Sequence, residues 1–181
     1  MAERIHRFAV DRTLGRLARK LRMLGFDTLS ECDLPRRRFE GLIGPERNFL
    51  TRNRREFARP APYRKILIQS DRVDAQVIEV LRVLRVQPAE IRPFRLCLLC
   101  NVPIEAVDRG DALGEVPDYV WETREIFSRC PRCRRIYWRG SHTERALREA
   151  QSWIRQAAER HRVETGDNGP GRGFPVASPE R

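Results

Sequence analysis

The sequence predicts an α/β fold in which helices cover a parallel sheet, followed by a small ribbon built on four cysteines and by one further helix. Two observations lead to this fold class. Short apolar runs alternate with segments of helical periodicity through the first half of the chain, which is the pattern of a parallel sheet with helical crossovers. Two C-x-x-C pairs then follow, Cys97 with Cys100 and Cys130 with Cys133.

The first strand and the first helix are expected in immediate succession. Residues 6–10 form a short apolar run that ends at Asp11. Apolar residues then recur at helical spacing, and Gly25 is expected just after the end of this helix. They are Leu14, Leu17, Ala18, Leu21 and Leu24. The opposite face carries basic residues, namely Arg12, Arg16, Arg19, Lys20 and Arg22. Such a face is commonly just solvated, but five cations without an acidic partner favour contact with phosphates.

Three more strands and two more helices complete the expected sheet domain. The strands are expected at Phe26–Ser30, Arg47–Thr51 and Lys65–Gln69. Between the second and third strands, prolines and glycines allow a helix of two turns at most. A longer helix is expected from Val73 to Leu84, where apolar residues share one face.

Polar and acidic residues follow each expected strand. In open parallel sheets the ligand site lies outside the carboxyl ends of the strands. The residues at those ends are Asp11, Glu31 or Asp33, Asn53, and Asp71 or Asp74. Converging carboxylates suit Mg²⁺ or Mn²⁺, which take oxygen ligands and leave room for a substrate phosphate. Such an ion can activate water for the hydrolysis of a phosphodiester bond.

A structural explanation of the same acids stands beside this one. Asp11 could merely cap the first helix, and Asp71 with Asp74 three residues later resembles a capping pair. Capping accounts for each aspartate singly. It does not account for several acids at one sheet edge beside many arginines.

The two C-x-x-C pairs have the spacing of a structural zinc site. Each pair can direct two thiolates at one ion, and four thiolates leave no open position for a substrate. The alternative is a pair of disulfides, which would leave Cys32 unpaired in a chain without the apolar run of a signal peptide. The sequence therefore favours structural Zn²⁺ at Cys97, Cys100, Cys130 and Cys133.

Cations and aromatic residues are mixed in the segment 134–142, just after the second pair. Such a mixture can bind RNA, and Trp138 is the candidate for base stacking. Trp138 could equally be a core residue of a ribbon strand. The expected organisation is a sheet domain at 1–96, a zinc ribbon at 97–140, a helix at 141–162 and a disordered tail at 163–181.

The formal net charge of +11 indicates a polyanionic partner. RNA is the first candidate, and association with the ribosome would produce the same excess of positive charge. No apolar run approaches the length of a membrane span, so no membrane association is expected. The cytoplasm is the expected location.

Several motifs together make the chain resemble the Mut-seven C-terminal RNase family. They are residues 8–11, 14–28, 50–54, Cys97 to Asn101, Cys130 to Cys133 and 137–142. The resemblance implies a PIN-like nuclease domain followed by a zinc ribbon, with Asp11 as a metal ligand. The chain departs from the family pattern at Asn53, where the family has an aspartate.

The expected function is the hydrolysis of RNA phosphodiester bonds with Mg²⁺ or Mn²⁺, weakened by Asn53. The expected catalytic set is Asp11, Asp33, Asn53 and Asp71. The expected RNA contacts are Arg12, Arg16, Arg19, Arg52, Arg54 and Trp138. The main alternative is a non-catalytic RNA- or ribosome-binding protein on the same scaffold, and a third is a DNA-associated ribbon protein.

Overall fold

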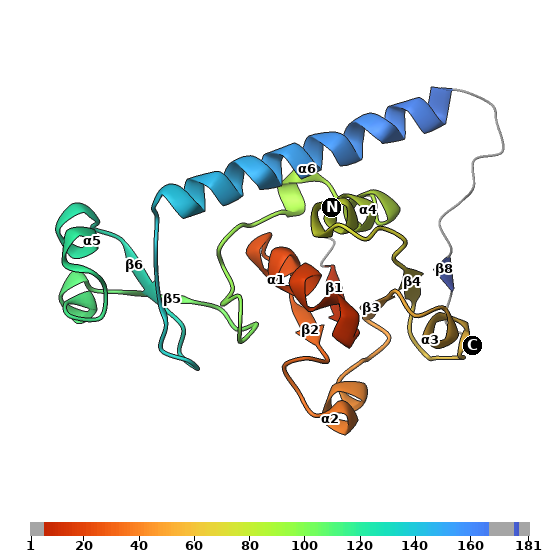
Figure 1. Ribbon diagram of the computed structural model, residues 1–181, viewed down its shortest axis with the longest axis horizontal. Helices are drawn as coiled ribbons and strands as arrows, with labels where there is room; N and C mark the ends of the chain where they lie inside the picture. Colours follow the sequence, from red (N-terminus) through yellow and green to blue (C-terminus); the bar gives the residue numbers. More distant parts are fainter. Residues whose placement is uncertain (1–5, 167–175, 178–181) are drawn as a thin grey trace.

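The computed structural model describes residues 6–166 and 176–177 of the chain. Helices flank a parallel sheet, a four-cysteine ribbon follows, and a long helix lies across the top of the sheet domain in Figure 1. The predicted fold class is therefore confirmed.

The main sheet has the strand order β2-β1-β3-β4-β8. Its four parallel strands are β1 (Arg7–Val10), β2 (Thr28–Ser30), β3 (Arg47–Thr51) and β4 (Lys65–Leu67). A two-residue strand, β8 (Val176–Ala177), pairs antiparallel with β4. From β1 the chain passes to β2 on one side and then crosses to β3 on the other. The order therefore reverses between β1 and β3, and this is the point where open sheets bind ligands.

Helices cover both faces of this sheet. They are η1 (Arg12–Leu14), α1 (Gly15–Met23), α2 (Arg36–Gly41), α3 (Arg54–Ala58), α4 (Val73–Val83), η2 (Pro88–Glu90) and α6 (Ser141–Gly166). Side chains of β1 alternate between the two faces, as a strand requires. Phe8 and Val10 pack with α1, α4 and α6 in the main core, whereas Ala9 packs with Phe39 of α2 on the other face.

Gly25 ends the first helix as expected. Its φ of 93° lies in the left-handed region that favours glycine. A side chain here would also meet the backbone, since a Cβ would lie 2.2 Å from the carbonyl oxygen of Arg92. This close approach lets the segment after η2 run beside the end of α1.

The ribbon is a separate three-stranded antiparallel sheet. Its strands are β5 (Glu105–Val107), β6 (Phe127–Arg129) and β7 (Ile136–Trp138), and between β5 and β6 lie η3 (Arg109–Ala112) and α5 (Asp118–Thr123). Phe127 and Ile136 pack with residues of η3 and α5 in a small core of their own.

Hydrogen bonds fasten the first cysteine loop (residues 97–101) to the sheet domain. The Asn101 side chain accepts from the N–H of Thr28 at 2.9 Å and donates to the Asp27 carboxylate at 2.6 Å. Burial would raise the pKa of Asp27, but hydrogen bonds from Arg47 and Asn101 hold it below its ordinary value. The expected domain boundary between residues 96 and 97 remains a proposal. Hydrogen bonds join the chain just after this boundary to the sheet domain.

The expected disordered tail, 163–181, falls largely outside the described residues. Residues 163–166 belong to α6, and residues 176–177 form β8. Within the described part of the chain, no helix combines the length and the apolar character that crossing a membrane requires.

Candidate active site and metal centre

The four cysteines of the two C-x-x-C pairs lie together. Their Sγ atoms are all within 4.8 Å of one another, and those of Cys97 and Cys133 are 3.7 Å apart. Zinc–sulfur bonds of about 2.3 Å place the ligands of a tetrahedral site about 3.8 Å from each other. All four thiols are free of disulfide bonds. This group therefore fits a structural zinc ion.

Hydrogen bonds favour the thiolate form of Cys97. Burial alone would raise the pKa of this thiol, but the hydroxyl of Tyr137 and the N–H groups of Cys100 and Leu99 lower it to about 6. The Tyr137 hydroxyl donates to the Cys97 Sγ at 3.1 Å. Donors of this kind orient a metal-binding thiolate and stabilise its charge.

The residue after each cysteine pair adopts a left-handed conformation. Asn101 has a φ of 56° and Arg134 a φ of 63°. Their N–H groups donate to the carbonyl oxygens of Cys97 and Cys130, at 3.0 and 2.9 Å respectively. The two loops are thus built alike. Asn tolerates this conformation better than most side chains do, and Arg does not share that advantage.

Asp11 lies at the carboxyl end of β1, next to the end of β3, where the strand order reverses. Its Oδ1 accepts from the N–H of Thr13 at 2.8 Å and from the Thr13 hydroxyl at 2.6 Å. Its Oδ2 accepts from the Thr51 hydroxyl and from the N–H of Arg52, the latter at 3.3 Å. These donors come from two chain segments and fix the carboxylate, which is only 8% exposed.

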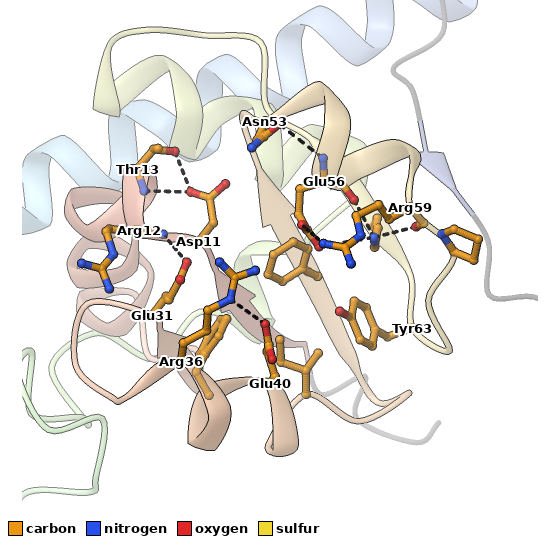
Figure 2. Close-up of a pocket in the computed structure, with 15 residues that line it drawn as sticks. Asp11, Arg12, Thr13, Glu31, Arg36, Glu40, Asn53, Glu56, Arg59 and Tyr63 are labelled. Atoms are coloured by element: carbon orange, nitrogen blue, oxygen red, sulfur yellow. Dashed lines mark hydrogen bonds and ion pairs between the residues drawn. The ribbon is translucent and has the colours of Figure 1, made fainter.

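Glu31 shares an open pocket of about 520 Å³ with Asp11 and Asn53. The Glu31 Oε2 accepts from the N–H of Arg12 at 3.0 Å, so this carboxylate is tied to the residue that follows Asp11. Figure 2 shows Asp11 and Glu31 on one side of the pocket and Asn53 on the other. Of the two acids that the sequence left open after β2, only Glu31 lines this pocket.

Asn53 is the N-cap of α3. Its Oδ1 accepts from the N–H groups of Arg55 and Glu56, at 2.9 and 3.3 Å. Asn53 belongs to the expected catalytic set, but its Oδ1 already has two backbone donors in the structure. An amide oxygen keeps some capacity as an acceptor but adds no negative charge.

The other two acids of the expected set line a second pocket, of about 820 Å³, beside the first. Asp33 forms an ion pair with Arg22 at 2.6 Å, and Asp71 forms one with Arg52. Asp74 lines the same second pocket. The structure thus brings Asp11 and Asn53 together and places Asp33 and Asp71 elsewhere.

The basic face of α1 is smaller than the sequence indicated. The expectation that Arg22 lies on this face is wrong, because it is 2% exposed and donates to the carbonyl oxygens of Leu98 and Leu99. Lys20 does have an acidic partner, Glu149 of α6, at 2.9 Å. The exposed cations that remain are Arg12, Arg16 and Arg19, and all three line the second pocket.

The remaining expected RNA contacts lie in different places. Arg52 is paired with Asp71, and Arg54 is exposed at the start of α3. Trp138 is half-buried in β7 and packs against the ribbon core. Its contact with RNA remains a prediction.

Several residues in or beside the pocket were not predicted from the sequence. Thr51 is buried and donates to Asp11; its place next to the Arg52–Asn53 motif was the available signal. Glu40, Glu56 and Tyr63 line the pocket from α2, α3 and the loop before β4. No sequence pattern distinguished these three from ordinary surface residues.

The carboxylates of the Asp11 pocket are spread apart. Among the described residues, the four cysteines are the one group in which three or more acidic, histidine or cysteine ligand atoms come within 4.8 Å of one another. The pocket carboxylates therefore form no closed cage. Mg²⁺ is usually held by one or two carboxylates together with water and substrate phosphates, and Asp11 and Glu31 are two of the carboxylates that line this pocket.

The fold and the cysteine group define the class of this protein, an α/β domain joined to a four-cysteine ribbon. The family model described as the Mut7-C RNAse domain matches residues 6–150. The chain belongs to this family, which confirms the resemblance inferred from its motifs. No curated protein and no solved structure was found to match the chain.

Proposed function

We propose that this chain is a metal-dependent ribonuclease that hydrolyses RNA phosphodiester bonds in the pocket of Asp11. The observation that carries the proposal is the position of Asp11. A carboxylate fixed by Thr13 and Thr51 lies at the strand-order reversal of an RNase-family domain, with Glu31 in the same pocket.

Asp11 and Glu31 would hold the ion, which when bound would supply an activated water and stabilise the leaving oxygen of the phosphodiester. The chain's own residues position these groups. The hydroxyls of Thr13 and Thr51 orient the Asp11 carboxylate, and the N–H of Arg12 orients Glu31. Asn53 lends the pocket a dipole where a carboxylate would add charge, so the proposed activity is weak.

The arginines beside the pocket would hold the RNA backbone. Arg12 lines both pockets, and Arg16 and Arg19 extend the positive surface along α1. None of the three forms an ion pair within the described residues, so their charges are available to phosphates. Most of the affinity for RNA would then come from phosphate contacts and would fall with salt.

A second candidate function is RNA or ribosome binding without cleavage. It is favoured by Asn53, whose oxygen caps α3, and by the open arrangement of the pocket carboxylates. A cleavage assay on single-stranded RNA with Mn²⁺ separates the two functions. We expect slow cleavage by the native chain and none by Asp11→Ala. Equal rates for the two proteins would contradict the proposal.

A further inference from the structure

We propose that the Asp11 pocket also contains a nucleobase-binding subsite, in which Tyr63 stacks on a base of the bound RNA and the carboxylates of Glu40 and Glu56 accept from its exocyclic amine. This inference rests on the proposed function and defines which nucleotides the pocket favours.

The aromatic part of the subsite is a row of three rings. The ring centroids of Phe39 and Phe49 are 6.3 Å apart, and those of Phe49 and Tyr63 are 5.7 Å apart. All three rings line the pocket, but Phe39 and Phe49 are almost fully buried, whereas Tyr63 is half-buried. Tyr63 thus presents a supported ring to the pocket, and a nucleobase stacks well on such a ring.

Three of the four cations that line this pocket are already engaged, and the fourth is Arg12. Arg36 pairs with Glu40 at 2.8 Å, and Arg59 pairs with Glu56 at 3.5 Å. The buried Nζ of Lys65 donates to the carbonyl oxygens of Glu56 and Arg59, at 2.6 and 2.7 Å. A phosphate would have to compete with these partners, so the Tyr63 end of the pocket is a poor phosphate site.

The second pocket has more unpaired cations than the first, although its Arg22 and Arg52 are paired with Asp33 and Asp71. Arg12, Arg16, Arg19 and Arg72 line it, and none of the four forms an ion pair within the described residues. Because Arg12 and Thr13 line both pockets, one RNA strand can reach from one to the other. The phosphates then follow the free arginines, and a base enters the Tyr63 end of the Asp11 pocket, where Arg36, Arg59 and Lys65 are already engaged.

The pocket walls favour particular bases. Figure 2 shows the Arg36–Glu40 pair and the Glu56–Arg59 pair around the interior, with Tyr63 near the latter. A carboxylate accepts from the amino group of cytosine, and the amino group of adenine offers the same donor. Uracil carries no exocyclic amine. The volume of about 520 Å³ lies within the range of roughly 300–1,000 Å³ for small-ligand pockets.

The test measures binding of short adenine, cytosine and uracil oligoribonucleotides by fluorescence anisotropy, without added Mg²⁺ or Mn²⁺. We expect the native chain to bind the adenine and cytosine oligomers several-fold more tightly than the uracil oligomer. Tyr63→Leu should weaken binding of the adenine oligomer roughly tenfold, whereas Tyr63→Phe should retain it. Glu40→Gln should reduce the preference for the adenine and cytosine oligomers over the uracil oligomer. Tyr119→Leu, a change at a 69% exposed tyrosine of the ribbon, is the matched control and should change nothing.

A second measurement does not depend on any variant's stability. An oligomer carrying 2-aminopurine should lose fluorescence when it binds the native chain, because stacking quenches this base. The proposed subsite is overturned if the native chain binds all three oligomers equally well, or if the 2-aminopurine oligomer binds without losing fluorescence. Either result leaves the ribonuclease proposal standing. Absence of RNA binding by the native chain overturns both.

Discussion

The carboxylate of Glu31 accepts a hydrogen bond from the backbone N–H of Arg12 at 3.0 Å. Since Arg12 follows Asp11 directly, this bond holds the acid at the end of β2 beside the acid at the end of β1. Asp33, two residues further on, faces Arg22 instead. These contacts thus separate two acids that the sequence could not tell apart, and we expect the two to have different roles.

Exchanging each of these acids for its amide should therefore give opposite results. Glu31→Gln should lower Mn²⁺-dependent cleavage at least about tenfold and leave the melting temperature nearly unchanged. Asp33→Asn should leave cleavage in place and lower the unfolding free energy by about 1 to 2 kcal/mol, because Arg22 loses a charged partner while Asp33 is 40% exposed. Cleavage rates and denaturant melts of both variants check this. Loss of cleavage in Asp33→Asn alone would reverse the assignment.

The four-cysteine group should carry one zinc ion per chain. Elemental analysis of the purified protein measures this directly. Cys130→Ser should lose the metal and unfold the ribbon, because the binding energy of a structural zinc is largely folding energy. Cys32→Ser is the matched control, because this exposed cysteine lies outside the group. The zinc content of this variant should equal that of the native chain. A metal-free native protein would refute the zinc site.

The free arginines of α1 should govern the salt dependence of RNA binding. Each phosphate contact on a single strand contributes about 0.7 to the slope of log affinity against log salt. Replacing Arg16 and Arg19 together by Ala should therefore reduce that slope by roughly 1.4. The affinity should fall by the same factor for all RNA sequences. Arg124 and Arg148, which are exposed and outside both pockets, provide the matched double variant. An equal effect of the two double variants would argue against a localised basic surface.

Arg134 should be a site where glycine stabilises the protein. Its φ of 63° lies in the left-handed region, which is unfavourable by about 1 kcal/mol or more for residues other than glycine. Arg134→Gly should raise the unfolding free energy of the zinc-loaded protein by up to about 1 kcal/mol. Arg132→Gly, within the same cysteine loop but without a positive φ, should give no gain. A stabilisation by Arg132→Gly equal to that of Arg134→Gly would contradict the strain explanation.

Much of the fold could be predicted from the sequence because its signals are local. The strand at Arg47–Thr51 has the bounds expected from its apolar run, and the cysteine spacing identified the metal group. The failures depend on contacts distant in sequence. Arg22 was expected opposite the apolar stripe of α1, yet it is buried and the first cysteine loop covers it. The helix α3 has only five residues, too few for a periodic pattern.

The candidate site was less predictable than the fold for the same reason. Strand ends identified Asp11 and Asn53, which do share a pocket. They did not show that Asp71 pairs with Arg52, or that Tyr63 reaches the pocket from the loop before β4. Side-chain partners of this kind arise only when elements pack, so strand order alone cannot assign them.

In the proposed ribonuclease site of Asp11 and its neighbours, the amide at position 53 weakens the activity. The variant Asn53→Asp tests this proposal. Asp caps a helix as well as Asn does, so the change adds a charge and preserves α3. Asn53→Ser keeps a cap without adding charge and serves as the control.

The deciding measurement is the rate of cleavage of single-stranded RNA across a Mn²⁺ titration for the native chain, Asn53→Asp, Asn53→Ser and Asp11→Ala. We predict slow cleavage by the native chain and none by Asp11→Ala. Asn53→Asp should cleave on the order of tenfold faster and reach half-maximal rate at lower Mn²⁺, because a third carboxylate strengthens metal binding. Asn53→Ser should not gain. If Asn53→Asp gains nothing, and Asp11→Ala cleaves like the native chain, the ribonuclease account is contradicted.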